Sequence, residues 1–501
     1  MEKRLPKGWS LVQLEDLSES KYYAIGDGDH GQIKPAMYRD SGVPYIRVGD
    51  MGWGTFSEEK LVYISNEVHQ DNLKSELLPG DVLIAKTGAT IGKCCIVPES
   101  ISKANTTSSV GKVSLNLKLT SSKFILYYFL SPGFYKMMWS YSNRTAQPGF
   151  NNRDLKIFPV PLPPKAEQER IVAKLDILFA EIERVKEGLA KIPVLMKNFR
   201  QAVLNQAVTG KLTEEWRKGK ELGDVEDLLN RLNQTREILI KDKKVREVKL
   251  KDTDKTDNLG VLPNNWKKSS LYNLANIIDP NPSHRMPIYY DEGIPFISTE
   301  NIINYDIDFR KGKKVGVETL KEQIKRFSIN DGDFIYTRIG TIGKSCYLPI
   351  ERNFCISHAV CIISSYDKLL ILPEFLRIAI GSEKIIEQGL HGVQSVGVPD
   401  LGMGKIRCFQ IPVCSVVEQQ EIVRRVEALF AQAHAIEARY EQLKEKIEQL
   451  PQAILAKAFR GELVPQDPND EPADKLLERI KALKSEAESM GKKMKNRKEK
   501  V

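Results

Sequence analysis

Two stretches of the chain carry apolar residues at alternating steps of four and three. Ten such positions lie within residues 171–203, and adding 251 to each gives ten seam positions within residues 422–454. This heptad rhythm is typical of a helix that buries one narrow seam against another helix. The alternative is two unrelated amphipathic core helices, but one shared register over ten positions favours an internal repeat. We predict two long antiparallel helices, each about 50 Å long at 1.5 Å per residue. The predicted coiled-coil seam includes Ile171, Leu175, Leu178, Ile182, Val185, Leu189, Ile422, Val426, Leu429, Ile436, Tyr440 and Leu443.

Proline interrupts both predicted helices. Pro193 and Pro451 fall inside the heptad runs at positions that are not equivalent. Because proline removes one helical hydrogen bond, we expect a kink or a short break at each.

The segments outside the helices also occur twice. Leu5-Pro6-Lys7-Gly8-Trp9 and Leu262-Pro263-Asn264-Asn265-Trp266 open two globular domains, and strand-like runs that contain Pro44 and Pro295 follow. Each domain then has a hairpin-like segment with a Gly-rich bend (residues 80–93 and 332–344), an apolar helical segment (124–130 and 372–380) and a Gly/Gln loop (144–152 and 389–397). A proline-flanked strand closes each domain. Mixed strands and helices place both domains in the α/β (α+β) class.

The repeat predicts the domain organisation. We assign residues 1–164 to a first globular domain, 165–209 to the first long helix and 210–259 to a helical, charged linker. Residues 260–414 form the second domain, 415–460 the second long helix and 461–501 a lysine-rich tail. The tail repeats the linker pattern, so a head-to-tail arrangement would bring it beside the N-terminal domain. The linker after Gly210 is expected to set where the second domain lies on the first helix.

Composition restricts the class of protein. A formal net charge of +9 is compatible with a polyanionic partner without being diagnostic of one. The seven cysteines include no C-x-x-C pair, which favours reduced thiols over a disulfide framework or a zinc site. No apolar leader and no run of about eighteen apolar residues is present, so we expect a cytoplasmic protein without a membrane partner.

Apparent catalytic motifs fail on inspection. Gly340-Thr341-Ile342-Gly343-Lys344-Ser345 resembles the end of a phosphate loop, but Arg338 occupies the position of its first glycine. Asp279-Pro280-Asn281-Pro282 lacks the aromatic residue of a methyltransferase tetrapeptide and is typical of a turn. His358 and His391 have no nucleophile or carboxylate at a recognisable spacing, and no metal-binding carboxylate pair is found. We predict a protein that is not an enzyme.

Several of these segments together resemble one known family, over nearly the whole chain. They are L-P-x-x-W, G-D-V-L-I-A-K-T-G-A-T-I-G-K, P-L-P-P-K-A-E-Q-E-R-I-V-A-K-L-D, N-F-R-Q-A-V-L-N-Q-A-V-T-G-K-L-T and Q-A-I-L-A-K-A-F-R-G-E-L. The combination resembles the specificity subunit of type I restriction-modification systems. The extra lysine-rich tail departs from that plan, which leaves the role of the tail open.

The resemblance implies function and partners. Each globular domain would be a target recognition domain for one half of a bipartite, asymmetric site in double-stranded DNA. The helices would set the spacing and dock two modification (methyltransferase) subunits, and restriction (motor and nuclease) subunits would join afterwards. No cofactor is expected on this chain; S-adenosylmethionine, ATP and Mg²⁺ are expected on the partner subunits.

Polar residues of the Gly-rich bends and the Gly/Gln loops are the candidate DNA contacts. Lysine, arginine and threonine in a bend can approach phosphates, and amide, arginine and histidine side chains can recognise base edges. The candidates are Arg47, Lys86, Thr87, Thr90, Lys93, Arg144, Gln147, Asn151, Asn152, Arg338, Thr341, Lys344, His391 and Gln394. Each could instead be a solvated loop residue. The bends, as the most similar segments of two domains that differ elsewhere, could also be turns that the fold requires.

Two other classes of function compete with DNA recognition. A self-sufficient DNA methyltransferase would bind S-adenosylmethionine, and the missing motifs argue against it. A coiled-coil scaffold that binds only proteins would explain the seams, but it would show no sequence-dependent DNA binding with its partners present.

Overall fold

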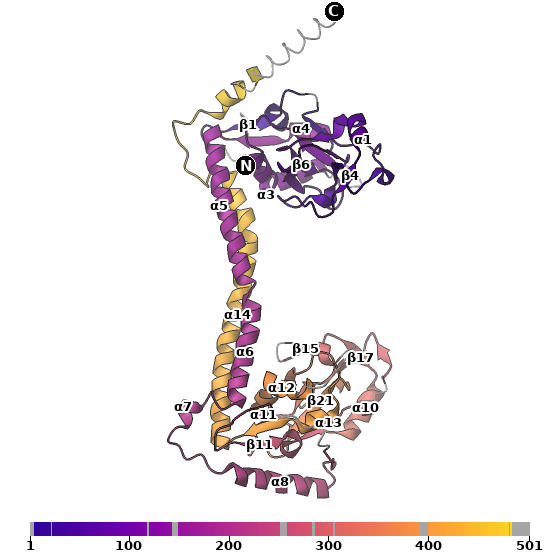
Figure 1. Ribbon diagram of the computed structural model, residues 1–501, viewed down its shortest axis with the longest axis vertical. Helices are drawn as coiled ribbons and strands as arrows, with labels where there is room; N and C mark the ends of the chain where they lie inside the picture. Colours follow the sequence, from indigo (N-terminus) through magenta and orange to yellow (C-terminus); the bar gives the residue numbers. More distant parts are fainter. Residues whose placement is uncertain are drawn as a thin grey trace, which may run out of the picture. The chain divides into compact units, whose positions relative to one another are not determined.

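The computed structural model describes residues 5–21, 23–117, 120–142, 149–250, 258–282, 286–303, 306–390, 399–479 and 481–482. The chain forms two compact units (Figure 1). Unit 1 comprises Met1–Ala190 and Glu441–Val501, and unit 2 comprises Lys191–Tyr440. Each unit therefore contains one globular domain and part of the long helices.

The domain of unit 1 contains two four-stranded sheets and a two-stranded ladder. The first sheet has the order β2 (Ile25–Asp27), β9 (Val110–Val113), β6 (Val82–Ala85) and β7 (Cys94–Ile96). The second has the order β4 (Val62–Ile64), β3 (Val43–Ile46), β8 (Ala104–Thr106) and β5 (Glu76–Leu77), in which β3 and β8 are parallel. The ladder joins β1 (Ser10–Gln13) to β10 (Pro159–Leu162), so the first and last strands of the domain close it together.

Helices cover the first sheet of unit 1. They are α2 (Ser122–Phe129), α3 (Pro132–Ser142) and α4 (Asn152–Ile157), while α1 (Asn66–Asp71) follows β4. The apolar sides of α2 and α3 bury Phe124, Phe129 and Phe134 against the sheet. Burial of three aromatic side chains is a large apolar contribution to the stability of this domain.

The domain of unit 2 repeats this plan. Its sheets have the orders β12 (Ala275–Ile278), β21 (Val360–Ser365), β18 (Phe334–Thr337), β19 (Ser345–Tyr347), and β13 (Tyr289–Tyr290), β17 (Lys313–Val315), β14 (Ile294–Ile297), β20 (Cys355–Ile356). The closing ladder joins β11 (Lys267–Ser270) to β22 (Gln410–Val413), and β15 (Ile302–Ile303) pairs with β16 (Asp306–Ile307). The helices are α9 (Leu271–Leu274), α10 (Val317–Arg326), α11 (Pro373–Ile380), α12 (Glu383–Leu390) and α13 (Met403–Cys408).

The predicted local elements are confirmed in both domains. The hairpin-like segments form the antiparallel pairs β6–β7 and β18–β19, and the apolar helical segments form α2 and α11. Pro44 and Pro295 are each the second residue of a strand. The fold is α/β (α+β) with an internal repeat, as the two copies of each segment predict.

The long helices are α5 (Lys165–Leu189), α6 (Ile192–Val208) and α14 (Val416–Ala458). The short break before α6 places Pro193 in its first turn, where a missing N–H costs little, and confirms the predicted break. Pro451 lies inside α14, and the helix continues through it to Ala458. Of the kink or short break predicted at Pro451, a break is therefore excluded.

The helices pair in antiparallel fashion within each unit. In unit 1 the beginning of α5, at Ile171 and Leu175, shares a buried cluster with the end of α14, at Leu455 and Ala458. In unit 2 the end of α6, at Val203, shares a cluster with the beginning of α14 at Ile422. The predicted antiparallel arrangement is confirmed.

The predicted assignment to the buried seam is wrong for three residues. The side chains of Val185, Ile436 and Leu443 are each 45% exposed. Ile171 and Ile422 are fully buried because their own globular domains also cover them, whereas the middle of a helix pair is covered only by the partner helix. Of the remaining seam positions, Leu175, Ile182 and Val426 are buried and Leu178, Leu189, Leu429 and Tyr440 are partly buried.

The second domain lies directly on α6. The Thr213 hydroxyl, which is fully buried, donates a hydrogen bond to Glu418 (2.7 Å), and the backbone N–H of Glu383 donates to the Gln201 side chain (3.0 Å). A Cβ on Gly210, which has φ of +73°, would lie 2.6 Å from Pro263. Direct contacts therefore hold this domain on the helix, and the expectation that the linker sets its place is not supported. The linker region contains α7 (Glu214–Arg217) and α8 (Val225–Lys241).

The segment that follows α14 lies against the domain of unit 1, as the head-to-tail arrangement predicts (Figure 1). A Cβ on Gly461 (φ +70°) would lie 2.4 Å from Pro6, which matches the contact of Gly210 with Pro263. Arg170 forms an ion pair with Asp470 (2.6 Å), and the Ala473 N–H donates to the Gly8 carbonyl (2.9 Å). Among the described residues, no helix combines the length and apolar character that crossing a bilayer requires.

Candidate nucleic-acid interface

The Gly-rich bends are tight turns that the fold requires. Residues 86–93 connect β6 to β7, and residues 338–344 connect β18 to β19. Gly92 and Gly343 have φ of +87° and +92°, which favours glycine. A Cβ would lie 3.1 Å from Met138 of α3 at Gly92 and 2.4 Å from Ile386 of α12 at Gly343. The similarity of the two bends thus has a structural cause.

Each bend lies beside the end of its Gly/Gln loop. Thr87 forms a β-bridge with Gly149, and Ile339 forms the equivalent bridge with Asp400. Two segments that the sequence separates by about sixty residues are therefore adjacent, and together they form the candidate interface of each domain. Arg144, Gln147, His391 and Gln394 lie outside the described residues.

Lys86 does not face solvent. The residue is 4% exposed, and its ammonium group lies 2.5 Å from Asp27 Oδ2 and 3.0 Å from Asn152 Oδ1. Burial alone would raise the pKa of Asp27, but hydrogen bonds from Lys86 and Asn152 and the lysine charge outweigh it and lower that pKa. The predicted phosphate contact of Lys86 is wrong, and the predicted DNA contact of Asn152 competes with this internal bond.

Arg338 is the equivalent cation of unit 2 and is also buried, with 2% exposure. Its guanidinium donates to Asp400 Oδ1 (3.0 Å), to the His358 carbonyl (2.8 Å) and to the Leu401 carbonyl (3.2 Å). The predicted phosphate contact of Arg338 is therefore also wrong. Desolvating an arginine is costly, and the bonds made by Nε and Nη1 offset part of that cost, while Nη2 lies 4.0 Å from the Asp279 carboxylate.

The two buried cations position the Gly/Gln loops. The backbone carbonyl of Lys86 accepts from the Phe150 N–H (3.1 Å), and that of Arg338 accepts from the Leu401 N–H (2.8 Å). Each cation thus fixes the residues where its loop rejoins the fold. The partners Asp27 and Asp400 were not among the predicted residues, because nothing in the local sequence marks a carboxylate about sixty residues away as a partner.

The remaining candidates differ in exposure. Thr87, Thr341 and Lys344 are exposed, and Thr90 and Lys93 are partly buried. The Lys344 ammonium donates to the Ile302 carbonyl (3.0 Å), which holds its side chain over β15. These five residues remain candidate phosphate contacts.

Two other candidates have structural partners. Asn151 is exposed but caps α4, since its side chain accepts from the Arg153 N–H (2.8 Å) and the Asp154 N–H (3.1 Å). Arg47 is partly exposed and donates to the Lys60 carbonyl (2.7 Å) from the second sheet. Both can contact DNA only with the atoms that these bonds leave available.

Comparison with known proteins decides the family. A family model described as the type I restriction modification DNA specificity domain matches residues 6–193 and 263–449. The chain belongs to the type I restriction-modification specificity family. It is 30% identical over 480 residues to the type I restriction enzyme EcoBI specificity subunit of Escherichia coli, covering 92% of this chain and 90% of that protein. It is 26% identical to the EcoKI specificity subunit of Escherichia coli K12, over 99% of each.

Solved structures agree on the fold. The HsdS subunit from Thermoanaerobacter tengcongensis matches with a TM-score of 0.55 and 18% identity, over 92% of this chain and 99% of that one. A chain from a structure of complex assembly in the type I R-M system matches with a TM-score of 0.57 and 17% identity, over 92% and 100%.

Family membership establishes the role of the two domains. The protein is a DNA-recognition subunit with two target recognition domains, and it is not the catalytic subunit of its restriction-modification complex. DNA and other subunits of such a complex are its partners. In the described part of the chain, no three His, Cys, Asp or Glu side chains are grouped so that they could hold a metal ion.

Sequence patterns did not indicate one exposed aromatic group of this specificity subunit. Trp53 and Tyr135 are 51% and 40% exposed and lie edge to face with their ring centroids 6.1 Å apart, and Trp139 continues the row. Tyr135 lies next to Gly92, because a Cβ there would be 3.5 Å from its ring. The aromatic row therefore borders the bend of the first domain and extends its candidate interface. Tyr135 and Trp139 are one helical turn apart on α3, but Trp53 lies about eighty residues earlier, so no local pattern joins it to them.

Proposed function

We propose that each target recognition domain recognises one half of a bipartite, asymmetric DNA site, and that the paired helices set the distance between the half-sites. Two-fold readers place recognition elements about one DNA turn apart, roughly 34 Å. Helix pairing of the length seen in α14 is sufficient for that distance. Because the two domains differ in sequence, the half-sites need not be related by symmetry.

The helices also bind two modification (methyltransferase) subunits in this proposal, and restriction (motor and nuclease) subunits join the complex afterwards. The observation that carries it is the apolar surface left on the helices. Ile177, Val185 and Leu443 of unit 1, and Val194 and Leu195 of unit 2, are 45–61% exposed. In the proposal, these exposed apolar side chains are the ones that a docked subunit covers.

The cofactors of the complex belong to those partners. S-adenosylmethionine would be bound by the modification subunits, and ATP and Mg²⁺ by the restriction subunits, with none on this chain. A DNA substrate and seven buried free thiols favour a cytoplasmic setting.

Exchange of one domain tests the division of the site. In the variant, residues 10–162 are replaced by the corresponding residues of another family member. A host strain would carry the gene for this variant together with the genes for the partner subunits. Methylation mapped across the genome should change at one half-site and keep the other half-site and the spacer. Changes at both half-sites would contradict the proposal.

Matched insertions test the role of the helices in spacing. Seven residues added after Ala190 and seven added after Tyr440 would lengthen both helices by about 10 Å while preserving the heptad phase. At 3.4 Å per base pair, methylation should move to a spacer about three base pairs longer, with the half-site bases unchanged. Methylation at the original spacing would contradict a spacing role for the helices.

Substitution of the exposed apolar residues tests docking. Val185→Asp should leave the stability of this chain nearly unchanged and weaken its binding to the modification subunit by about tenfold, as the loss of a buried interface residue does. Lys186→Ala on the same helix is the matched control, because Lys186 is ion-paired to Glu183 on its own helix. Equal binding by both variants would place the docking surface elsewhere.

A further inference from the structure

The linker of unit 2 lies across a short helix at the start of its domain. Beyond α8, the Val248 N–H donates to the Tyr272 hydroxyl of α9 (2.9 Å). Arg236 of α8 donates to the neighbouring Asn273, and its guanidinium lies 5.2 Å from the centre of the Tyr272 ring. The positions occupied by Tyr272 and Asn273 are therefore the docking points for the linker.

Unit 1 has the same short helix at the same place. Its 3-10 helix η1 (Leu14–Leu17) follows β1 as α9 follows β11. The Leu14 N–H donates to the Phe158 carbonyl (3.0 Å), as the Leu271 N–H donates to the Phe409 carbonyl (2.8 Å). Adding 257 to residue numbers relates the two segments, so Glu15 and Asp16 occupy the positions of Tyr272 and Asn273.

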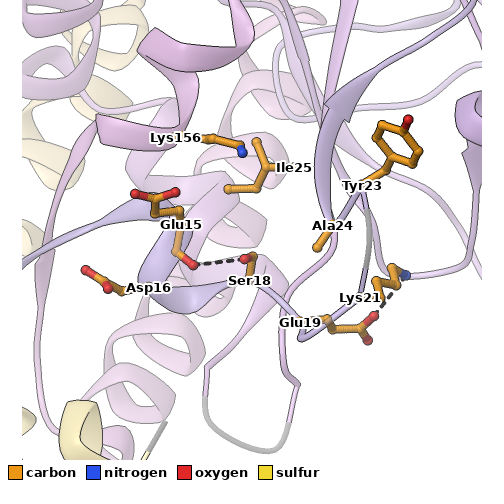
Figure 2. A pocket seen from close by; sticks show the side chains of 9 residues that line it. All are labelled: Glu15, Asp16, Ser18, Glu19, Lys21, Tyr23, Ala24, Ile25 and Lys156. Carbon is orange, nitrogen blue, oxygen red and sulfur yellow. Dashed lines mark hydrogen bonds and ion pairs between the residues drawn. The ribbon is translucent and has the colours of Figure 1, made fainter. Parts of the chain in front are cut away.

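These acidic residues line a surface hollow of about 500 Å³ (Figure 2). Glu15, Asp16 and Glu19 contribute three carboxylates to it. Lys21 and Lys156 also line it, and Lys21 is ion-paired with Glu19 (2.8 Å), so the carboxylates exceed the ammonium groups by one. At the corresponding three positions unit 2 has the neutral residues Tyr272, Asn273 and Asn276. The docking points have thus become acidic in unit 1.

The chain that follows α14 approaches this hollow in the same way as the linker. Residues 473–479 are helical, and Ala473, Leu476 and Leu477 pack in the cluster that contains Leu14 and Leu17. In unit 2, Val225, Leu228 and Leu229 of α8 pack in the cluster that contains Leu271 and Leu274. The two helical segments therefore have equivalent contacts, and an offset of 248 relates them.

The sequence beyond residue 482 has the complementary charge. With the same offset, Lys484 stands where the linker has Arg236, and residues 492–500 stand where it has residues 244–252. Residues 492–500 contain six basic residues and one acidic residue. Basic side chains thus correspond to Arg236 and to the stretch around Val248, which contact the short helix in unit 2.

We propose that residues 484–500 bind the hollow formed by Glu15, Asp16 and Glu19 within the same chain. The lysine-rich segment is then the counterpart of the linker, with ion pairs in place of the neutral contacts to Tyr272 and Asn273. Its function is to hold the segment after α14 on the first target recognition domain.

Carbodiimide cross-linking of the full chain tests the contact, because this reagent joins only ammonium and carboxylate groups that touch. Mass spectrometry should find peptides that link residues 484–500 to residues 14–21. A mixture of isotopically light and heavy chains should give links within one isotope only. Links to other parts of the chain, links only between isotopes, or no links would overturn the proposal.

Lysine acetylation rates give a second readout. In the double variant Glu15→Gln/Glu19→Gln, the lysines of residues 484–500 should react about threefold faster than in the unaltered chain, as expected for loss of surface ion pairs, and 1 M salt should remove the difference. Glu67→Gln/Asp71→Asn, on exposed positions of α1, is the matched control and should change nothing. Equal rates in the Glu15/Glu19 variant and the unaltered chain would overturn the proposal. Asp16 is left unchanged because its carboxylate accepts from the N–H of Gln13, the residue that precedes η1 (3.0 Å).

Discussion

The ammonium group of Lys86 lies 2.5 Å from the Asp27 carboxylate, at the point where the Gly/Gln loop of the first domain rejoins the fold. Only 5% of the lysine side chain and 14% of the aspartate side chain are exposed. Unit 2 has Arg338 at the position of Lys86, with Asp279 within 4.0 Å and Asp400 within 3.0 Å. Both domains thus place a buried cation, paired with a carboxylate, next to the residues that follow the loop expected to contact bases.

Removal of one charge of this pair should be strongly destabilising. Lys86→Met leaves Asp27 buried without its cation, and we expect a loss of about 3 kcal/mol in the free energy of unfolding of the first domain. The double variant Asp27→Asn/Lys86→Met leaves no buried charge and should recover much of that loss. Urea denaturation measures both values, and equal stability of the single variant and the unaltered chain would mean that the pair contributes nothing.

The same pair predicts how stability depends on pH. The pKa of Asp27 is lowered in the folded state, so its contribution is complete above the pKa of the unfolded chain, near 4, and is lost as the pH falls through the folded value. Without Lys86, the hydrogen bond and the positive charge that lower this pKa are lost, so the pKa of Asp27 in the folded state moves upward. Acid unfolding of Lys86→Met should therefore begin at a higher pH than that of the unaltered chain, as followed by circular dichroism. The double variant should show neither effect.

Two substitutions on α5 distinguish the buried seam from the exposed helix surface. Leu175→Asp places a charge at a fully buried position and should cost several kcal/mol. Val185→Asp, on the same helix at a position that is 45% exposed, should change stability by about 0.5 kcal/mol or less. Thermal unfolding measures the contrast. Similar losses for the two variants would indicate that Val185 is buried in solution.

Glu167 and Glu418 occupy equivalent positions and should respond differently to neutralisation. Glu418 accepts hydrogen bonds from Thr213 (2.7 Å), Arg217 (2.8 Å) and Trp266 (2.9 Å), so Glu418→Gln should destabilise unit 2 by about 3 kcal/mol. Burial raises the pKa of the Glu167 carboxyl group. This group accepts a hydrogen bond from the indole N–H of Trp9 (3.1 Å).

A raised carboxyl pKa means that stability falls as the pH rises from the unfolded to the folded value. Glu167→Gln should therefore be neutral or stabilising at pH 7, and its advantage should vanish below about pH 4. Denaturant unfolding at both pH values tests this difference. A large loss at pH 7 would show that the ionised carboxylate is required.

The salt dependence of DNA binding distinguishes lysines that contact phosphate from exposed lysines that do not. In the assembled complex, Lys344→Ala should reduce the slope of log K against log salt by about one unit, because an exposed lysine in the bend neutralises one phosphate. Lys218→Ala, at an exposed position paired with Glu215, is the matched control. An unchanged slope in Lys344→Ala would mean that Lys344 does not contact phosphate. Lys93→Ala should behave like Lys344→Ala.

The sequence alone determined the features that depend on local spacing and repetition. Heptads within residues 171–203 and 422–454 predict the helix pairing, and the duplicated Leu-Pro-x-x-Trp and Gly-rich segments predict two similar domains. These patterns are reliable because a seam or a tight turn requires particular residue types at fixed intervals along the chain. The family resemblance rests on the same segments.

Tertiary structure decided which polar and apolar side chains are exposed. Lys86 and Lys344 are both basic residues of the Gly-rich bends, at the first and the last position. Lys86 is buried against Asp27 of a distant strand and Lys344 is exposed, which the residue type does not indicate. Likewise Leu175 and Val185 share one heptad pattern, but only Leu175 lies where a globular domain adds to the cover of the partner helix. The burial of a side chain depends on which distant parts of the chain pack against it, and local periodicity does not indicate those parts.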